Sequence, residues 1–256
     1  MAVLVEADGL NAGYGSVVVV RDLDLQVNAG EVVALLGPNG AGKSTTLLTL
    51  SGDLPPLGGT VRWNGTATKA PLHARARRGL GLVTEERSVF MRLTTRENLR
   101  VGCPDIEPAL DMFPELRTRL NVRAGLLSGG EQQMLTLARA LARDPSLLLA
   151  DELSLGLAPL VVKRLLGAVR AAADRGVGVL LVEQHVSKVL EIADRVCVLR
   201  RGRVQIAGTA ADLRGRLTDI EASYLADRAD SADRGDGSGT GAPLSEPPAA
   251  RRVTPA

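Results

Sequence analysis

A glycine-rich run between two apolar stretches carries the clearest chemistry in this 256-residue sequence. Gly37–Thr45 reads GPNGAGKST, follows the apolar residues Val32–Leu36 and precedes the largely apolar residues 46–50. A strand that ends in such a turn and continues into a helix directs several backbone N–H groups at one point, where an anion binds. In this spacing Lys43 supplies positive charge for the β- and γ-phosphates, and the Ser44 hydroxyl is a ligand for Mg²⁺. The predicted nucleotide-binding residues of this loop are Gly37, Pro38, Asn39, Gly40, Ala41, Gly42, Lys43, Ser44 and Thr45.

A second segment with chemical potential is Leu127–Gln133, which reads LSGGEQQ and opens a predicted helix. The apolar residues that follow recur at the period of an α-helix and define one buried face. Ser128 and Glu131 fit a capping box, which alone would account for their spacing. The glycines Gly129 and Gly130 are unfavourable in a helix, so close approach of the backbone to a phosphate is the second interpretation.

Two adjacent carboxylates, Asp151 and Glu152, come directly after the apolar residues 147–150. Ligands of open α/β sheets bind at the carboxyl ends of the strands. Asp151 is therefore placed to hold Mg²⁺ through its water shell, and Glu152 to orient and polarise an attacking water. A helix cap or a solvated pair is the simpler interpretation of Asp-Glu alone, but together with the phosphate loop the pair is strong evidence for a site that binds Mg²⁺ and phosphate.

The elements that must position these residues indicate an α/β fold. Alternation of apolar and polar residues predicts strands at 3–10, 23–27 and 59–65, which form an N-terminal antiparallel layer. Wholly apolar strands at 147–150 and 177–182, each preceded by a helical segment, predict a mostly parallel core sheet. Residues 196–199 and 203–206 predict a closing hairpin. From about residue 227 the chain has few apolar side chains, so 227–256 is expected to be a disordered tail.

Composition excludes several classes of protein. No apolar run approaches the roughly 18–20 residues that cross a bilayer, and no secretion signal is present at the N-terminus, so we expect an intracellular chain. With 31 basic and 29 acidic residues the net charge is +2, which is too balanced to indicate a nucleic-acid surface.

The phosphate loop, the Leu127–Gln133 segment and the Asp151-Glu152 strand end, in this order, resemble the ATP-binding subunits of ABC transporters. The resemblance covers about residues 3–225 and implies a phosphate-loop ATPase domain over 1–226, with a small helical subdomain inserted at about 87–135. It implies ATP and Mg²⁺ as ligands. It also implies a dimer, in which Ser128, Gly129 and Gly130 of one subunit cap the γ-phosphate held by the phosphate loop of the other.

The same resemblance assigns further positions. Tyr14 stands where an aromatic ring stacks on adenine, although a tyrosine at a core or edge position needs no ligand. Glu85 replaces a glutamine that contacts Mg²⁺ and the membrane partner. Gln184 stands at the position of the switch histidine, and the neighbouring His185 is either a second candidate or a solvated helix-start residue. Leu153 replaces a common proline, and Ala158 replaces a common aspartate in the loop between subunits.

Glu85, the segment 131–135 and the segment 154–159 are similar to the branched-chain amino acid importer branch of the family. The resemblance thus implies an ATPase subunit on the cytoplasmic face of the membrane, with permease subunits, a second ATPase subunit and indirectly a solute-binding protein as partners, and no nucleic acid. Glu152, Lys43, Gln184 and His185 are the catalytic candidates, and Ser44, Asp151 and Glu85 the metal candidates. A soluble ABC-type ATPase that acts on nucleic acid or ribosomes is the alternative. An unrelated phosphate-loop kinase or GTPase would leave Leu127–Gln133 unexplained.

Overall fold

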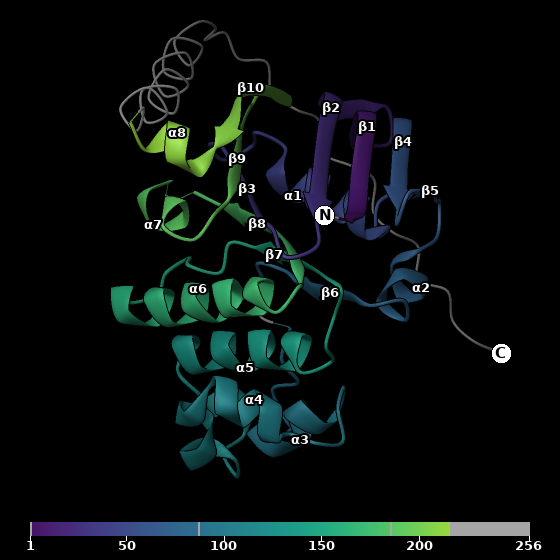
Figure 1. Ribbon diagram of the computed structural model, residues 1–256. Coiled ribbons are helices and arrows are strands. Elements are labelled where there is room, and N and C mark those ends of the chain that lie inside the picture. The colour runs from purple at the N-terminus through teal and green to yellow at the C-terminus, as the bar shows by residue number, and fades with distance from the viewer. Residues whose placement is uncertain (1, 87, 185, 216–256) are drawn as a thin grey trace, which may run out of the picture.

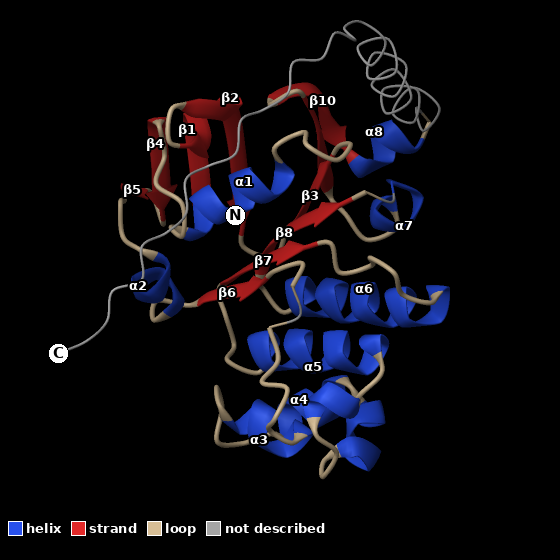
Figure 2. Cartoon of the chain, turned by 180° about the vertical axis from the view of Figure 1, so that it is seen from behind, coloured by secondary structure: helices blue, strands red, loops and turns tan. Residues whose placement is uncertain are grey.

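The computed structural model describes residues 2–86, 88–184 and 186–215. Two β-sheets and two groups of helices form layers, with α1 (Lys43–Ser51) between the sheets (Figures 1 and 2). The predicted tail at 227–256 and the candidate His185 lie outside the described residues.

The N-terminal sheet is antiparallel and has the strand order β2-β1-β4-β5. β1 (Val3–Tyr14) and β2 (Val17–Asn28) pair along almost their whole length, with irregularities in the register. Both strands are longer than predicted. They stay hydrogen bonded to each other across segments in which apolar and polar residues do not alternate, so the sequence pattern alone underestimates their length. β4 (Gly58–Trp63) and the short β5 (Thr66–Ala67) complete the predicted antiparallel layer.

The core sheet has six strands in the order β10-β9-β3-β8-β7-β6 and is parallel except for the last hairpin. The α/β fold with a mostly parallel core and an antiparallel layer is confirmed. The sheet consists of β3 (Val32–Leu36), β6 (Leu80–Val83), β7 (Leu147–Asp151), β8 (Gly178–Glu183), β9 (Arg195–Arg200) and β10 (Arg203–Thr209). β6 was missed, because four residues that include Gly81 are too short and too weakly patterned for a prediction from sequence.

Alternate residues of the core strands belong to two hydrophobic cores, one on each face of the sheet. On β3, Val33 and Leu35 pack with α1 and the antiparallel sheet, whereas Ala34 and Leu36 pack toward the helices on the opposite face. That face is covered by α5 (Gly129–Leu141) and α6 (Pro159–Asp174), below which α3 (Thr95–Arg100) and α4 (Glu107–Met112) lie (Figure 2). The sheet is thus buried on both sides, as its wholly apolar strands require.

The region between β6 and α5 is helical. It contains α3 (Thr95–Arg100), α4 (Glu107–Met112) and the 3₁₀ turns Pro114–Arg119 and Ala124–Leu126, packed beside α5 at one end of the molecule (Figure 1). Among the described residues, the other helices are α2 (Leu72–Ala76), α7 (Val186–Leu190) and α8 (Ala210–Arg214).

Arg75, on α2, is a buried cation that stabilises the end of α1. Its Nη1 donates to the carbonyl of Leu50 at 2.5 Å and its Nε to the carbonyl of Ala70 at 2.8 Å. Arg75→Met should keep the packing of the aliphatic stem but leave both carbonyls unsatisfied, which lowers the free energy of unfolding by about 2 kcal/mol. Urea denaturation measures this loss. Arg78→Met, on an exposed neighbour, is the control and should change stability little; equal losses in both variants would contradict the assignment.

Candidate functional site

The phosphate loop joins the end of β3 to the start of α1. Gly42 caps α1 with φ +103°, a left-handed backbone that side chains rarely adopt. At Gly37 a Cβ atom would lie 2.3 Å from the carbonyl oxygen of Leu199. These glycines are therefore required by the path of the backbone, and the expected strand–turn–helix context of the motif is present.

A pocket of about 420 Å³ lies over this loop and gathers residues from four strand ends. Its lining includes loop and α1 residues together with Glu85 after β6, Glu152 after β7 and Gln184 after β8. Six of the predicted loop residues line it: Asn39, Gly40, Gly42, Lys43, Ser44 and Thr45. The other predicted loop residues, Gly37, Pro38 and Ala41, do not line the pocket.

Lys43 is buried, with 5% of its surface exposed. Its Nζ donates to the carbonyl of Pro38 at 3.2 Å and lies 3.7 Å from Oε1 of Glu152. Burial lowers the pKa of Lys43, whereas Glu152, Asp151 and Glu183 act in the opposite direction and favour its charged form. The cation thus lies at the centre of a group of carboxylates from β7 and β8.

Asp151 is buried at the end of β7, and its Oδ1 has no hydrogen-bond partner. Burial raises the pKa of Asp151, which a hydrogen bond from Ser44 and the charge of Lys43 partly offset. A buried, unsatisfied carboxylate oxygen beside a serine hydroxyl fits a divalent cation, because Mg²⁺ takes hard oxygen ligands. No group of three or more His, Cys, Asp and Glu residues suited to a metal occurs in the part of the chain described.

Removing the charge of Asp151 should therefore stabilise the chain while weakening its response to Mg²⁺. Asp151→Asn eliminates an anion whose raised pKa shows that the fold disfavours ionisation, so we expect about 1 kcal/mol of added stability without nucleotide. Thermal unfolding with and without MgATP measures both effects, and the further stabilisation by MgATP should fall. Asp53→Asn, on an exposed carboxylate, is the control. A lower melting temperature for Asp151→Asn without ligand would count against this reading.

Glu152 has a left-handed backbone, with φ +47°. Its N–H donates to the carbonyl of Val182 at 2.9 Å, and its Oε1 accepts a hydrogen bond from Nε2 of Gln184 at 2.7 Å. Strained conformations of this kind occur at functional sites and are held by their surroundings. Between the two switch candidates, the structure places Gln184 against Glu152, and the neighbouring His185 is not among the described residues.

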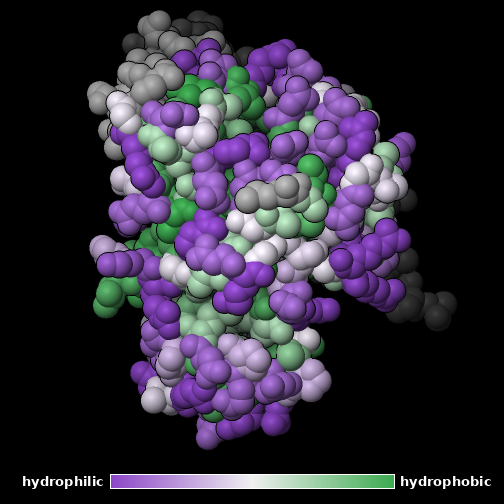
Figure 3. Space-filling view, in the orientation of Figure 1, coloured by the Kyte–Doolittle hydropathy of each residue, from purple (hydrophilic) through white to green (hydrophobic). Residues whose placement is uncertain are grey.

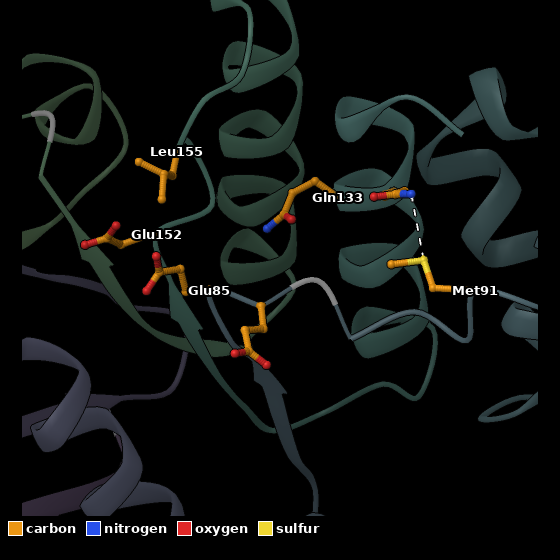
Figure 4. A pocket seen from close by; sticks show the side chains of 7 residues that line it. Glu85, Met91, Gln133, Glu152 and Leu155 are labelled. Atoms are coloured by element: carbon orange, nitrogen blue, oxygen red, sulfur yellow. Dashed lines mark hydrogen bonds between the residues drawn. The ribbon is translucent and has the colours of Figure 1, made fainter. Parts of the chain in front are cut away.

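A second pocket of about 490 Å³ adjoins the first and shares Glu85, Glu152 and Leu155 with it. Figure 4 shows these side chains on one side, with Gln133 of α5 and Met91 across from them. Glu85 is exposed and its charge raises the pKa of Asp151, so it lies near the proposed metal ligands. Three glutamates, with Glu86 as the third, make this space unfavourable for an anion.

The start of α5 has both bonds of the predicted capping box. The Ser128 hydroxyl accepts from the Glu131 N–H at 3.3 Å, and the Glu131 carboxylate accepts from the Ser128 N–H at 2.8 Å. Arg119 pairs with the other oxygen of Glu131 at 2.7 Å and is the main cause of its lowered pKa. A Cβ at Gly130 would lie 3.1 Å from Val161, so packing against α6 accounts in part for that glycine.

The predicted ligands Ser128, Gly129 and Gly130 do not line the pocket over the phosphate loop, nor does Tyr14. Tyr14 is 52% exposed and ends β1, paired across the hairpin with the exposed Val17. Val19, two residues beyond Val17 on β2, does line the pocket. The structure thus brings the phosphate, metal and carboxylate candidates together, and leaves the adenine and γ-phosphate-capping candidates apart from them within one chain.

Sequence reasoning missed the pair Ser154 and Glu183, which lie directly behind Glu152 and Gln184. The available signal was the placement of a carboxylate at the end of an otherwise apolar strand. Val19 was also missed, because one valine in an alternating strand carries no specific signal.

Two further features are the hydropathy of the surface and the length of the helices. On the face in Figure 3, hydrophilic side chains are intermixed with smaller apolar areas. Over the described residues, no helix has the length and apolar character needed to cross a membrane.

A parallel sheet with a phosphate loop after β3, and carboxylates at the ends of β7 and β8, defines a phosphate-loop nucleotide-binding protein. Comparison with known proteins is more specific: the profile described as "ABC transporter" matches residues 20–154. The chain belongs to the ABC transporter ATP-binding family. It hydrolyses ATP in transport, as this family does.

Curated relatives support the same assignment. A high-affinity branched-chain amino acid transport ATP-binding protein, BraG of Pseudomonas aeruginosa, is 40% identical over 216 residues, 80% of this chain and 93% of the relative. A probable branched-chain amino acid transport ATP-binding protein, LivF of Archaeoglobus fulgidus, is 38% identical over 80% of this chain and 91% of its own length. The lipopolysaccharide export ATP-binding protein LptB of Escherichia coli K12 is 35% identical, over 81% and 91%.

Solved structures are similar as well. An ATP-binding subunit of an ABC transporter superposes with a TM-score of 0.73 at 30% identity, over 90% of this chain and 99% of the other. The ADP conformation of MJ1267, an ATP-binding cassette of an ABC transporter, has a TM-score of 0.79 at 23% identity, over 88% and 99%, and so supports the fold alone.

Proposed function

We propose that this chain is the ATP-hydrolysing subunit of an ABC importer for branched-chain or related amino acids. The observation that carries the proposal is the convergence of Lys43, Ser44, Asp151, Glu152 and Gln184 around one pocket. The solute class rests on the similarity to BraG and LivF, which are branched-chain amino acid transport proteins.

The site residues have distinct roles in this proposal. Lys43 and the backbone N–H groups of the loop bind the β- and γ-phosphates of ATP. Ser44 and Asp151, with Glu85 nearby, hold Mg²⁺, which neutralises phosphate charge when bound. Glu152 polarises the attacking water, and Gln184 orients Glu152 through the hydrogen bond at 2.7 Å. Catalysis then consists mainly of positioning and charge stabilisation.

The proposal includes a second ATPase subunit, either another copy or a different chain. Ser128, Gly129 and Gly130 form a helix start that suits a phosphate, yet they do not line the pocket of their own chain. In the dimer they cap the γ-phosphate bound by the partner, and Tyr14 stacks on adenine. Leu155, which is 47% exposed beside Glu152, belongs to the surface that such a partner would cover.

The proposed permease contact is the groove of about 300 Å³ between β6 and α5. Phe90 and Val101, which are 50% and 54% exposed, line it together with Arg139 and Arg143. Exposed apolar side chains next to cations fit an amphipathic cytoplasmic segment of a membrane subunit. In this proposal the chain is peripheral on the inner face of the membrane, with a solute-binding protein as an indirect partner.

Purification from membranes tests the proposal. The tagged chain, co-expressed with the permease genes beside its own, should co-purify with them, and its ATPase activity in proteoliposomes should rise with a solute-binding protein loaded with leucine, isoleucine or valine. Phe90→Glu should reduce co-purification, whereas Leu57→Glu, on an exposed apolar residue outside the groove, is the control. If a solute of another class stimulates the ATPase activity instead, the proposed class of transported solute is wrong. Co-purification with RNA or DNA instead of permeases would support the alternative, a soluble ABC-type ATPase acting on nucleic acid or ribosomes.

A further inference from the structure

Glu183 is a buried carboxylate, 1% exposed, at the end of β8. Both of its oxygens accept hydrogen bonds from the same residue, Ser154. The Ser154 N–H donates to Oε1 at 2.9 Å, and the Ser154 hydroxyl donates to Oε2 at 2.6 Å. Ser154 is itself only 6% exposed. A buried carboxylate is costly unless it is fully hydrogen bonded, so this two-point contact is a specific feature of the fold.

The contact lies directly behind the residues assigned to hydrolysis. Ser154 follows Glu152 by two positions, and Glu183 immediately precedes Gln184. The Glu152 N–H also donates to the carbonyl of Val182, and Gln184 donates to the Glu152 carboxylate. The turn at residues 152–154 is thus hydrogen bonded to each residue of the strand end 182–184.

The turn needs such support because of its backbone. A non-glycine residue with φ +47°, as at Glu152, costs roughly 1–3 kcal/mol and persists only where the surroundings hold it. The ladder bond to Val182 fixes the start of the turn, and the Ser154–Glu183 contact fixes its end. Leu153 between them is buried in the hydrophobic core.

We propose that Glu183 is a positioning residue for ATP hydrolysis. By accepting both Ser154 donors, Glu183 holds the turn in the conformation that presents the Glu152 carboxylate to the phosphate pocket. The same contact fixes the start of residues 155–158, which precede α6. The inference rests on the proposed role of Glu152. It assigns no direct contact between Glu183 and the nucleotide.

The test uses Glu183→Gln and Ser154→Ala in the full chain. The glutamine has the same shape, but it is neutral and its NH₂ group cannot accept the hydrogen bond that the Ser154 hydroxyl donates, so that charge-assisted bond is lost; the alanine removes the hydroxyl alone. We expect kcat to fall about tenfold or more in each, because small displacements of a catalytic group are costly, while the Kd for MgATP stays within about twofold. The kcat of the double variant should be little lower than that of Glu183→Gln alone, since both substitutions break the same contact.

Glu31→Gln is the matched control for loss of a buried carboxylate. Glu31 is 6% exposed, accepts hydrogen bonds from Asn28 and Arg195, and precedes β3 at the opposite end of the strand from the phosphate loop. It should lower the melting temperature without changing kcat. The inference is overturned if Glu183→Gln and Ser154→Ala retain wild-type kcat. It is also overturned if kcat and MgATP affinity fall together in these variants, which would indicate a merely structural role.

Failure of this inference can be told from failure of the proposed function. If Glu152→Gln leaves turnover unchanged, the assigned role of Glu152 is wrong, and Glu183 has nothing to position. If Glu152→Gln stalls hydrolysis while the Glu183 and Ser154 variants turn over normally, only the positioning role is wrong.

Discussion

Glu152→Gln is expected to reduce ATP turnover by roughly 10²–10³-fold while ATP still binds. The carboxylate is the group that can polarise water at the end of β7, and the amide keeps its shape but not its basicity. The amide oxygen can still accept the bond from Gln184, so the turn should keep its conformation. Nucleotide should therefore accumulate on the enzyme, and the proposed dimer should persist.

Two measurements check this prediction. Phosphate release gives the turnover, and size-exclusion chromatography with MgATP shows whether a nucleotide-bound dimer accumulates. Glu86→Gln is the control, because Glu86 lines the neighbouring pocket and is exposed. Unchanged turnover in Glu152→Gln would rule out the assigned role.

Lys43→Ala should abolish measurable turnover, with a loss of at least about 10²-fold, and should also weaken the binding of MgATP. Lys43 is the cation among the carboxylates of this pocket, 3.7 Å from Glu152. Without it, the negative charges of Asp151 and Glu152 oppose the phosphates with less compensation. The interaction is present in the ground state and is stronger in the transition state, so both the affinity for MgATP and kcat should fall.

Equilibrium binding of a fluorescent ATP analogue and steady-state ATPase assays separate these effects. Lys163→Ala, on an exposed position of α6, should leave both quantities unchanged. If Lys43→Ala binds MgATP with wild-type affinity, the cation does not hold the phosphates in the ground state. If it also turns over normally, the phosphate-loop assignment fails.

Local patterns determined much of the site. The GPNGAGKST run predicted the turn between a strand and a helix, because only glycine tolerates its left-handed and close-packed positions. The capping box at Ser128 and Glu131 depends on neighbours three residues apart and formed as predicted. The hairpin at Arg200–Gly202 also formed, with positive φ at Arg201 and Gly202.

Other features depended on the whole fold. β6 becomes a strand because β7 supplies its ladder partners, although Leu80–Val83 alone has little pattern. The preference for Gln184 over His185 rested on alignment in the sequence. The structure adds the contact between Gln184 and Glu152, which lie 32 residues apart.

The sequence by itself determined the groups available to this protein: a glycine-rich phosphate loop, and two adjacent carboxylates to which we assign the binding of a metal and the activation of water, each encoded in a few adjacent residues. The tertiary structure decided how these groups meet. The parallel order β3-β8-β7 brings Lys43, Gln184 and Glu152 to one edge of the sheet, and the buried Ser154–Glu183 contact sets the turn that carries Glu152. Such long-range contacts depend on burial and strand pairing, so no local pattern could predict them.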